Sequence, residues 1–310
     1  MAEHAVYFAS EAQMRRYKAQ KIITQVLLYG FLSLMGLFII IPFYYMIITS
    51  FKSTDAYNAE VLNGQLNLLL TSKNFTFDQY VKVMGKSGDF GIFYLNTIYT
   101  AVCSTIFTVV TSVLAAFAFA RVNFKGKDLI FTILLGTMMI PGEMMMITNF
   151  QTTMALNWKD TFAALIFVHG VSVFYIFYLR QTFQQIPNEL FLAAKVDGYG
   201  HFAYLWKCMI PIALPTIVTI MILSLMGAWN AYIWPQLVAS GKHPWLFGEK
   251  VHDMHLVSNG LMAKFQSTEF VSDDPAKVTG SLFATIPLFI FFLIFRKYIM
   301  RGVSRSGIKG

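Results

Sequence analysis

Charged residues are scarce in this chain of 310 residues, of which Asp, Glu, Lys and Arg make up only 13%. Soluble domains contain about 25% of them. Apolar residues reach 56%, which is more than a soluble protein of this size can bury. The composition therefore excludes a soluble globule and a disordered chain. The chain has only two cysteines, Cys103 and Cys208, so a disulfide scaffold is excluded as well. What remains is a protein that crosses a membrane several times.

A complete phosphate-binding loop is also missing from the sequence. Gly85, Lys86 and Ser87 resemble the end of such a loop, but Tyr80 stands where its first glycine is required. We therefore expect no ATP site in this chain. The sequence shows no paired carboxylates, Ser–His arrangement or convincing cluster of metal ligands near the bilayer surface, so we expect neither an enzyme nor a metal site.

Six apolar segments are candidates for membrane-spanning helices, which need about 20 residues each. They are residues 22–49, 93–120, 129–148, 161–179, 215–238 and 278–295. The last segment spans a bilayer readily only if its helix continues past Arg296 with the charges reaching the interface. The first is too long for the core of a signal peptide and is expected to remain as an uncleaved anchor.

The distribution of Lys and Arg sets the expected orientation, because cytosolic loops carry the excess of these residues. With the N-terminus inside, 15 of the 24 basic residues lie on the inner side, whose net charge is +10, against −2 outside. Both termini are therefore expected in the cytosol, in a multi-pass protein of the plasma or inner membrane. The basic balance is explained by topology, so nucleic-acid binding is not expected. The expected division is a cytosolic segment 1–21, a six-span domain 22–300 and a cytosolic tail 301–310. Outer loops cover 51–92 and 239–277.

The loop between the fourth and fifth spans, residues 186–215, has the pattern of two short helices joined by a turn. Pro187 suits the first turn of a helix, and Asp197-Gly198 is a stop signal in which Gly supplies a positive φ. A second helix is expected over residues 199–208, ending before Pro211. Apolar side chains recur along both helices: Leu190, Ala193, Ala194, Val196, Phe202, Leu205, Trp206 and Met209. Such a surface either packs on its own bundle or docks a partner.

Three motifs resemble one known family. Ala193-Ala194, Gly198 and Ile210-Pro211 together resemble the signature loop of ABC importer permeases. The run from Trp229 to Pro235, with sequence WNAYIWP, is similar to a motif of carbohydrate permeases. The ending from Arg296 to Gly310 looks like the tail of the G-type permease subunits of maltose transporters. The resemblance implies an all-helical membrane protein with the MetI-like ABC importer permease fold, one subunit of an importer for a sugar or oligosaccharide.

The same resemblance implies partners. They are a second permease subunit, two ATPase subunits, an extracytoplasmic sugar-binding protein and membrane lipid. ATP and Mg would lie on the ATPases, with no cofactor in this chain. The implied ATPase-coupling residues of the loop are Glu189, Leu192, Ala193, Ala194, Asp197, Gly198, Phe202 and Pro211. The implied ATPase contacts of the tail are Arg301, Gly302, Lys309 and Gly310. The chain departs from the family at Leu192, where a Glu is usual, and at Cys208, where an Ile is usual. Glu189 is the candidate to replace that Glu.

The residues of the translocation path are left open by the sequence. Trp229, Asn230 and Tyr232 either contact a sugar by stacking and hydrogen bonding or serve the structure. In the second case Trp234 belongs to an aromatic belt and Asn230 bonds a neighbouring helix. Ala116 and Ala120 are expected to allow close helix packing. The outer loop 239–277 is long enough to indicate a function, which we expect to be docking of the binding protein.

Two alternative functions remain. A permease for a glycerol-phosphate-type substrate would share these motifs. An ion-coupled carrier is less favoured, because such carriers place acidic relays at mid-membrane and five of the six segments have no acidic residue in their apolar middles.

Overall fold

The computed structural model describes residues 11–65, 67–71, 74–85, 89–244, 251–268 and 270–304. These residues are mostly helical, with one antiparallel pair of short strands, β1 (Lys242–Pro244) and β2 (Val251–Asp253). The predicted all-helical class is confirmed apart from this hairpin. The chain divides into two compact units, Met1–Gln79 and Tyr80–Gly310.

The first unit is dominated by helix α1 (Glu11–Ser50), which contains the predicted span 22–49 and begins earlier than expected. Its apolar side chains are exposed along most of its length within the described residues, and burial begins only at Ile48. A helix that is apolar on all sides requires a membrane or a partner around it. α1 therefore has the properties expected of a spanning helix.

The chain after α1 folds around a buried ion pair. Ser53 caps helix α2 (Thr54–Leu62) by accepting a hydrogen bond from the Ala56 amide. The Lys52 ammonium is fully buried, where it pairs with Glu60 and donates to the Asn67 carbonyl oxygen at 2.7 Å. Burial by itself raises the pKa of Glu60, but hydrogen bonds from Lys52 and Asn67 and the Lys52 charge hold it below its ordinary value. The first half of the predicted outer loop 51–92 is thus an ordered structure.

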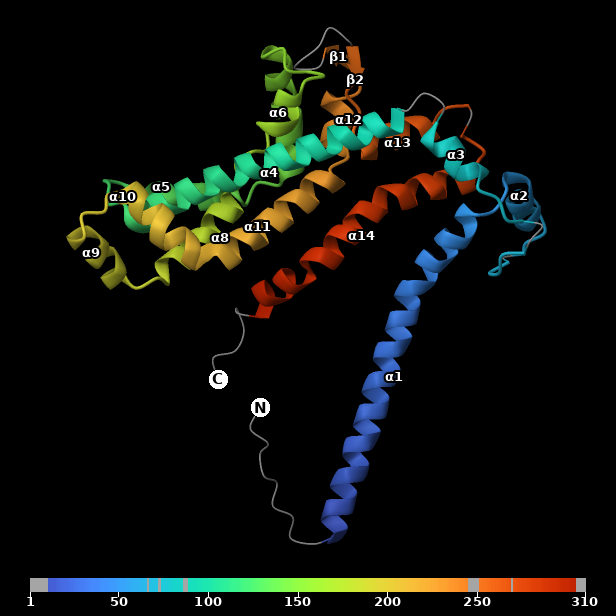
Figure 1. Cartoon of the computed structure of the whole chain (residues 1–310), viewed down its shortest axis with the longest axis horizontal. Helices are drawn as coiled ribbons and strands as arrows, with labels where there is room; N and C mark the ends of the chain where they lie inside the picture. The colour runs from blue at the N-terminus through green and yellow to red at the C-terminus, as the bar shows by residue number, and fades with distance from the viewer. Residues whose placement is uncertain are drawn as a thin grey trace. The chain divides into compact units, whose positions relative to one another are not determined.

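Helix α4 (Asp89–Arg121) is the centre of the second unit and confirms the predicted helix over 93–120. It packs along α8 (Val173–Gln184) and α11 (Ile210–Asn230), as Figure 1 shows. Their shared core contains Val113, Phe117, Leu179, Phe183, Met209, Ala213 and Ile220. Ala116 is fully buried in this core, so its predicted role in close helix packing is confirmed. Ala120 packs against the same core.

The third predicted span, 129–148, is not one straight helix. It consists of α5 (Lys127–Thr137) and α6 (Gly142–Ala155), which meet at an angle of 98°. The break falls at Pro141, which lacks an N–H and disfavours the helical conformation of the residue before it. The prediction of a continuous helix was wrong because the apolar composition concealed the effect of Pro141 and Gly142.

The fourth predicted span, 161–179, is interrupted as well. Helix α7 (Phe162–Ile166) is separated from α8 by a non-helical segment over residues 167–172. Gly170 lies so close to α4 that a Cβ there would be 2.1 Å from the Phe107 ring. The Thr111 hydroxyl donates to the Gly170 carbonyl oxygen at 3.0 Å. Close approach to α4 thus fixes the interruption in place.

The fifth predicted span, 215–238, differs from the structure at both ends. Helix α11 begins before residue 215 and stops before residue 238. α11 stops at Asn230, and α12 (Ile233–Val238) follows after Ala231 adopts an extended conformation. Pro235 explains the break, because its ring would clash with the Ala231 carbonyl in a continuous helix. That carbonyl accepts a hydrogen bond from Ser258 at 2.6 Å instead.

At its other end, α11 is joined to the second helix of the predicted 186–215 loop. α10 (His201–Tyr204), the π-helix η1 (Leu205–Met209) and α11 follow one another without a gap. The prediction of a separate helix that ends before Pro211 was therefore wrong. Pro211 lies within the first two positions of α11, where its missing N–H costs little, and the wider π turn directly precedes it.

The last segment of the chain forms α13 (Val257–Phe265) and α14 (Asp274–Ser304). α14 continues past Arg296, as the sixth predicted span required. A short helix, α3 (Asp78–Met84), lies at the start of the second unit, where Lys82 pairs with Asp273 at 2.6 Å. The predicted outer loop 239–277 therefore contains the β1–β2 hairpin and α13 rather than open loop.

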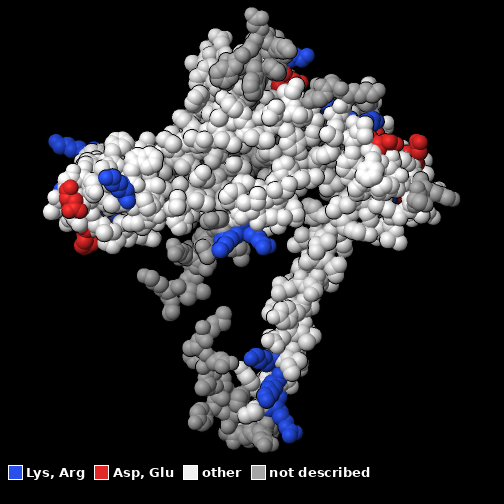
Figure 2. Space-filling view, in the orientation of Figure 1, with Lys and Arg blue, Asp and Glu red and all other residues white. Residues whose placement is uncertain are grey.

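Four helical stretches among the described residues are long and apolar enough to cross a membrane. They are Gln13–Ser50, Phe90–Arg121, His201–Asn230 and Asp274–Lys297, and the bent pair α5–α6 is a fifth if it counts as one span. Figure 2 shows that most of the visible surface over the middle of the second unit is free of charge, with charged side chains toward its ends and one basic group at the lower edge of the view. This pattern suits a protein surrounded by lipid.

Candidate functional site

Helix α9 (Asn188–Val196) forms the first half of the 186–215 segment, as predicted. It begins directly after Pro187 and ends in a Schellman turn: the Gly198 amide donates to the Lys195 oxygen at 3.0 Å, and the Tyr199 amide donates to the Ala194 oxygen at 2.8 Å. Gly198 has φ of 79°. The predicted stop at Asp197-Gly198 and its positive φ are confirmed.

One face of the 186–215 segment packs on its own bundle. Ala194, Tyr204, Leu205 and Met209 are buried in the core shared by α4, α8 and α11. The Phe191 ring lies 5.0 Å from the Tyr204 ring, centroid to centroid. This packing holds α9 against the first residues of the 201–230 helical stretch.

The rest of the segment leaves several apolar side chains exposed within the described residues. It presents Leu190, Leu192, Val196, Phe202 and Trp206, and we call these five residues the exposed apolar set. Phe202 and Trp206 are 69% and 65% exposed. Glu189, Ala193, Asp197, Gly198 and Pro211 are exposed as well. The structure therefore brings the predicted coupling residues to one accessible segment, although Ala194 points into the core.

Arg121, at the end of α4, fixes the entrance of α9. Its guanidinium donates to the carbonyl oxygens of Phe183 (2.8 Å) and Ile186 and to the Asn188 side chain (3.3 Å). Sequence reasoning counted Arg121 only as a basic residue that sets orientation. Its position one residue past a spanning segment gave no indication of these partners, which lie more than 60 residues away in the chain.

The predicted path residues do not form one site. Trp229 is buried and its indole N–H donates to the Ala284 oxygen of α14 at 3.1 Å. Asn230 is exposed and donates to the Met226 oxygen of its own helix at 3.0 Å, and its bond to a neighbouring helix stays a prediction. Tyr232 is exposed in the break after α11. Their contact with a substrate remains a prediction.

Trp234 is not part of an exposed aromatic belt. It is buried among α7, α12 and the chain before α13, and its indole N–H donates to the Ala164 oxygen at 3.0 Å. The His169 ring lies across its edge, with centroids 5.0 Å apart. The proline that follows Trp234 breaks the helix and turns this indole into the protein.

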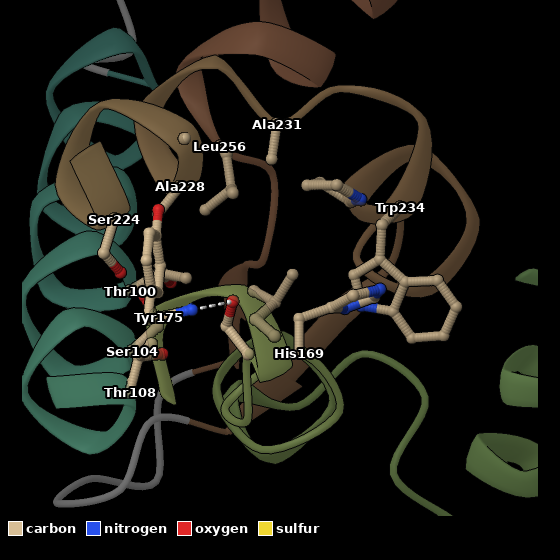
Figure 3. A pocket seen from close by; sticks show the side chains of 14 residues that line it. Thr100, Ser104, Thr108, His169, Tyr175, Ser224, Ala228, Ala231, Trp234 and Leu256 are labelled. Carbon is tan, nitrogen blue, oxygen red and sulfur yellow. Dashed lines mark hydrogen bonds between the residues drawn. The ribbon is translucent and has the colours of Figure 1, made fainter. Parts of the chain in front are cut away.

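A cavity of about 330 Å³ lies next to Trp234, among α4, α8, α11 and α12. Figure 3 shows Thr100, Ser104 and Thr108 on α4 along one side, with His169 and Trp234 across from them. Ser172, Tyr175 and Ser224 add further hydroxyl groups. The sequence analysis missed these residues, although hydroxyls four residues apart on an apolar helix were a signal that could have found them.

The predicted tail contacts fall at the edge of the described chain. Arg301 and Gly302 belong to the last turns of α14, and Lys309 and Gly310 lie outside the described residues.

Comparison with known proteins identifies the class of this chain. The profile of the family described as binding-protein-dependent transport system inner membrane component matches residues 108–305. The match covers more than half of the chain, so the protein belongs to this family, and the predicted membership is confirmed.

Individual relatives match over almost the whole chain. One is the arabinooligosaccharides transport system permease protein AraQ of Bacillus subtilis, with 27% identity covering 96% of this chain and 100% of the relative. Another is the trehalose/maltose transport system permease protein MalG of Thermococcus litoralis, with 28% identity covering 94% and 99%. A chain from the crystal structure of a bacterial ABC transporter involved in import of the acidic polysaccharide alginate has the same fold. Its TM-score is 0.72 at 24% identity, covering 94% of this chain and 99% of that one.

Proposed function

We propose that the chain is the transmembrane permease subunit of an ATP-driven importer for a sugar or oligosaccharide. Family membership supports the transport role, and the names of AraQ and MalG support a saccharide as cargo. In this proposal six spans cross the plasma or inner membrane with both termini in the cytosol. The bent pair α5–α6 and the interrupted pair α7–α8 each supply one crossing. The subunit forms half of the translocation path, and a second permease forms the other half.

The 186–215 segment couples the subunit to two ATPase subunits. The observation that carries this proposal is the combination of an ordered Schellman turn after α9 with the exposed apolar set beside it. A short helix with exposed apolar side chains fits a groove on a partner and transmits rigid-body motion. Glu189 is exposed in the first turn of α9. It supplies the carboxylate that the family usually has at the position of Leu192. ATP and Mg bind on the ATPases.

The outer side of the subunit receives cargo from an extracytoplasmic binding protein. In the proposed topology the 51–79 segment and the β1–β2 hairpin with α13 belong to the outer loops, whereas the 186–215 segment belongs to the cytosolic side. Arg301, Gly302, Lys309 and Gly310 contribute a second contact with the ATPases at the cytosolic face.

Copurification tests the coupling role. The chain is coexpressed with the second permease and a tagged ATPase, and the complex is purified in detergent. We expect the wild-type chain to be recovered with the ATPase and the Phe202→Asp, Trp206→Asp double variant to be lost at equal membrane levels. Recovery of the double variant in full would contradict the docking role. Uptake that collapses with a proton uncoupler while ATP is maintained would favour an ion-coupled carrier.

Reporter fusions test the topology. A fusion after Lys309 and another within residues 55–65 are expected to report opposite sides of the membrane. Signals from the same side for both fusions would contradict the six-span arrangement.

A further inference from the structure

Two separate interruptions of the helical chain border the same cavity. His169 and Ser172 come from the non-helical segment between α7 and α8, and Ala231 comes from the break between α11 and α12. Irregular backbone at membrane depth is tolerated where it is buried in protein or lines a polar cavity. In membrane transporters, paired helix breaks around one cavity are typical of a binding site.

The cavity wall is rich in hydroxyl groups. Thr100, Ser104 and Thr108 project from successive turns of α4. Thr100 is 4% exposed, and its hydroxyl finds no hydrogen-bond partner among the described residues. A buried hydroxyl without a partner costs about 1–3 kcal/mol. A ligand hydroxyl that reaches this oxygen would remove the cost, and the hydroxyl groups of Ser104 and Thr108 on the same wall offer it further partners.

The wall contains no formal charge. Among the described residues that line the cavity, none is Asp, Glu, Lys or Arg. A carboxylate or phosphate placed there would lose its water without gaining a counter-ion, which is strongly unfavourable. The wall therefore selects against acidic ligands.

An aromatic surface completes the cavity. The Trp234 indole N–H is already bonded to Ala164, so the apolar part of the ring and the neighbouring His169 ring form the side that faces the hydroxyl groups of α4 (Figure 3). Sugar rings have apolar C–H faces and polar edges, so they match a cavity with one aromatic and one hydroxylic side.

We propose that this cavity is a subsite for one uncharged sugar ring during translocation. This inference rests on the proposed function and deepens it by naming the class of cargo. A volume of about 330 Å³ is at the small end of the range for ligand cavities, about 300–1,000 Å³. A longer saccharide would pass through it ring by ring.

The test uses the complete importer, with its second permease, ATPases and binding protein, reconstituted in liposomes. Two sets of tritiated oligosaccharides serve as probes: neutral ones from starch and arabinan, and acidic ones from pectin and alginate. Uptake and binding-protein-stimulated ATP hydrolysis are measured together for Thr100→Val, Thr108→Val and the control Thr105→Val. Thr105 is also buried on α4 and also lacks a bonded partner among the described residues, but it does not line the cavity.

We expect uptake of neutral probes only. Thr100→Val and Thr108→Val should each lower uptake about three- to tenfold, the range for one lost hydrogen bond, while stimulated ATP hydrolysis stays within twofold of wild type. Thr105→Val should transport normally. Uptake of acidic probes at the neutral rate, or equal uptake by the Thr100 and Thr105 variants, would overturn the subsite. Failure of the ATPases to copurify with the chain would instead overturn the proposed function itself.

Discussion

The guanidinium of Arg121 donates a hydrogen bond to the backbone oxygen of Phe183 at 2.8 Å, so the end of α4 is tied to the end of α8. The same side chain reaches Ile186 and Asn188, where α9 begins. One side chain therefore links α4 to the start of α9, and α4 also contributes one wall of the cavity.

Replacing Arg121 by Gln should weaken this connection. Hydrogen bonds from a charged donor are worth about 1.5–3 kcal/mol each, and Gln is too short to serve all three acceptors. We expect the subunit to lose about 2 kcal/mol of stability, measured by thermal unfolding of the purified subunit in detergent. We also expect the binding protein to stop stimulating ATP hydrolysis by the complete importer. Lys125→Gln removes the same charge from an exposed position nearby and should change neither quantity. Equal behaviour of the two variants would rule out the connecting role.

Substitution of Gly198 should disturb the turn after α9. A β-branched residue at φ of 79° is strained by about 1–3 kcal/mol, although a Cβ at this position would meet no neighbouring atom within 4 Å. We expect Gly198→Val to insert, to pair with the second permease and to lose ATPase coupling. Gly200 has φ of −73° and equally open space, so Gly200→Val serves as the control. Wild-type uptake by the Gly198 variant at equal membrane levels would falsify the docking assignment of the 186–215 segment.

Two adjacent alanines should respond differently to a charge. Ala193 is exposed and Ala194 is 5% exposed in the core. Ala193→Asp should leave the subunit stable and abolish ATPase copurification, because the charge is buried only in the docked complex. Ala194→Asp should instead lower the melting temperature of the subunit alone. A destabilised Ala193 variant would show that this position packs inside the chain.

The Lys52–Glu60 pair should make the 51–79 segment sensitive to acid. The pKa of Glu60 is held below its ordinary value of about 4.5, so its stabilising contribution is complete above that value and is lost as the pH falls through the lowered pKa. We expect amide-exchange protection of residues 53–65, corrected for intrinsic rates, to fall below about pH 4.5. Glu60→Gln should lower protection at pH 7 by about 2 kcal/mol and remove this acid response. Unchanged protection in Glu60→Gln at pH 7 would show that the pair is dispensable.

Composition and motif were sufficient to predict the helical membrane class and the turn at Gly198. They were sufficient because apolar length and a required positive φ are local properties of the sequence. The interruptions at Gly170 and Ala231 were not predicted. The first depends on contacts with distant residues, Phe107 and Thr111. The second follows from Pro235, a local signal that the apolar composition concealed. The cavity was missed because its hydroxyl groups come from helices far apart in the chain.

The joining of α10, η1 and α11 into one stretch has a mechanical consequence. Trp206 of the exposed apolar set and Ala228 of the cavity wall lie on this stretch, separated by about 30 Å at 1.5 Å per residue. The stretch contains two bending points, the π turn η1 and Pro215. Where it moves as one piece, a tilt of about 10° about one end displaces the other by about 5 Å. Under the proposed docking, a tilt imposed at Trp206 would therefore shift the cavity wall at Ala228.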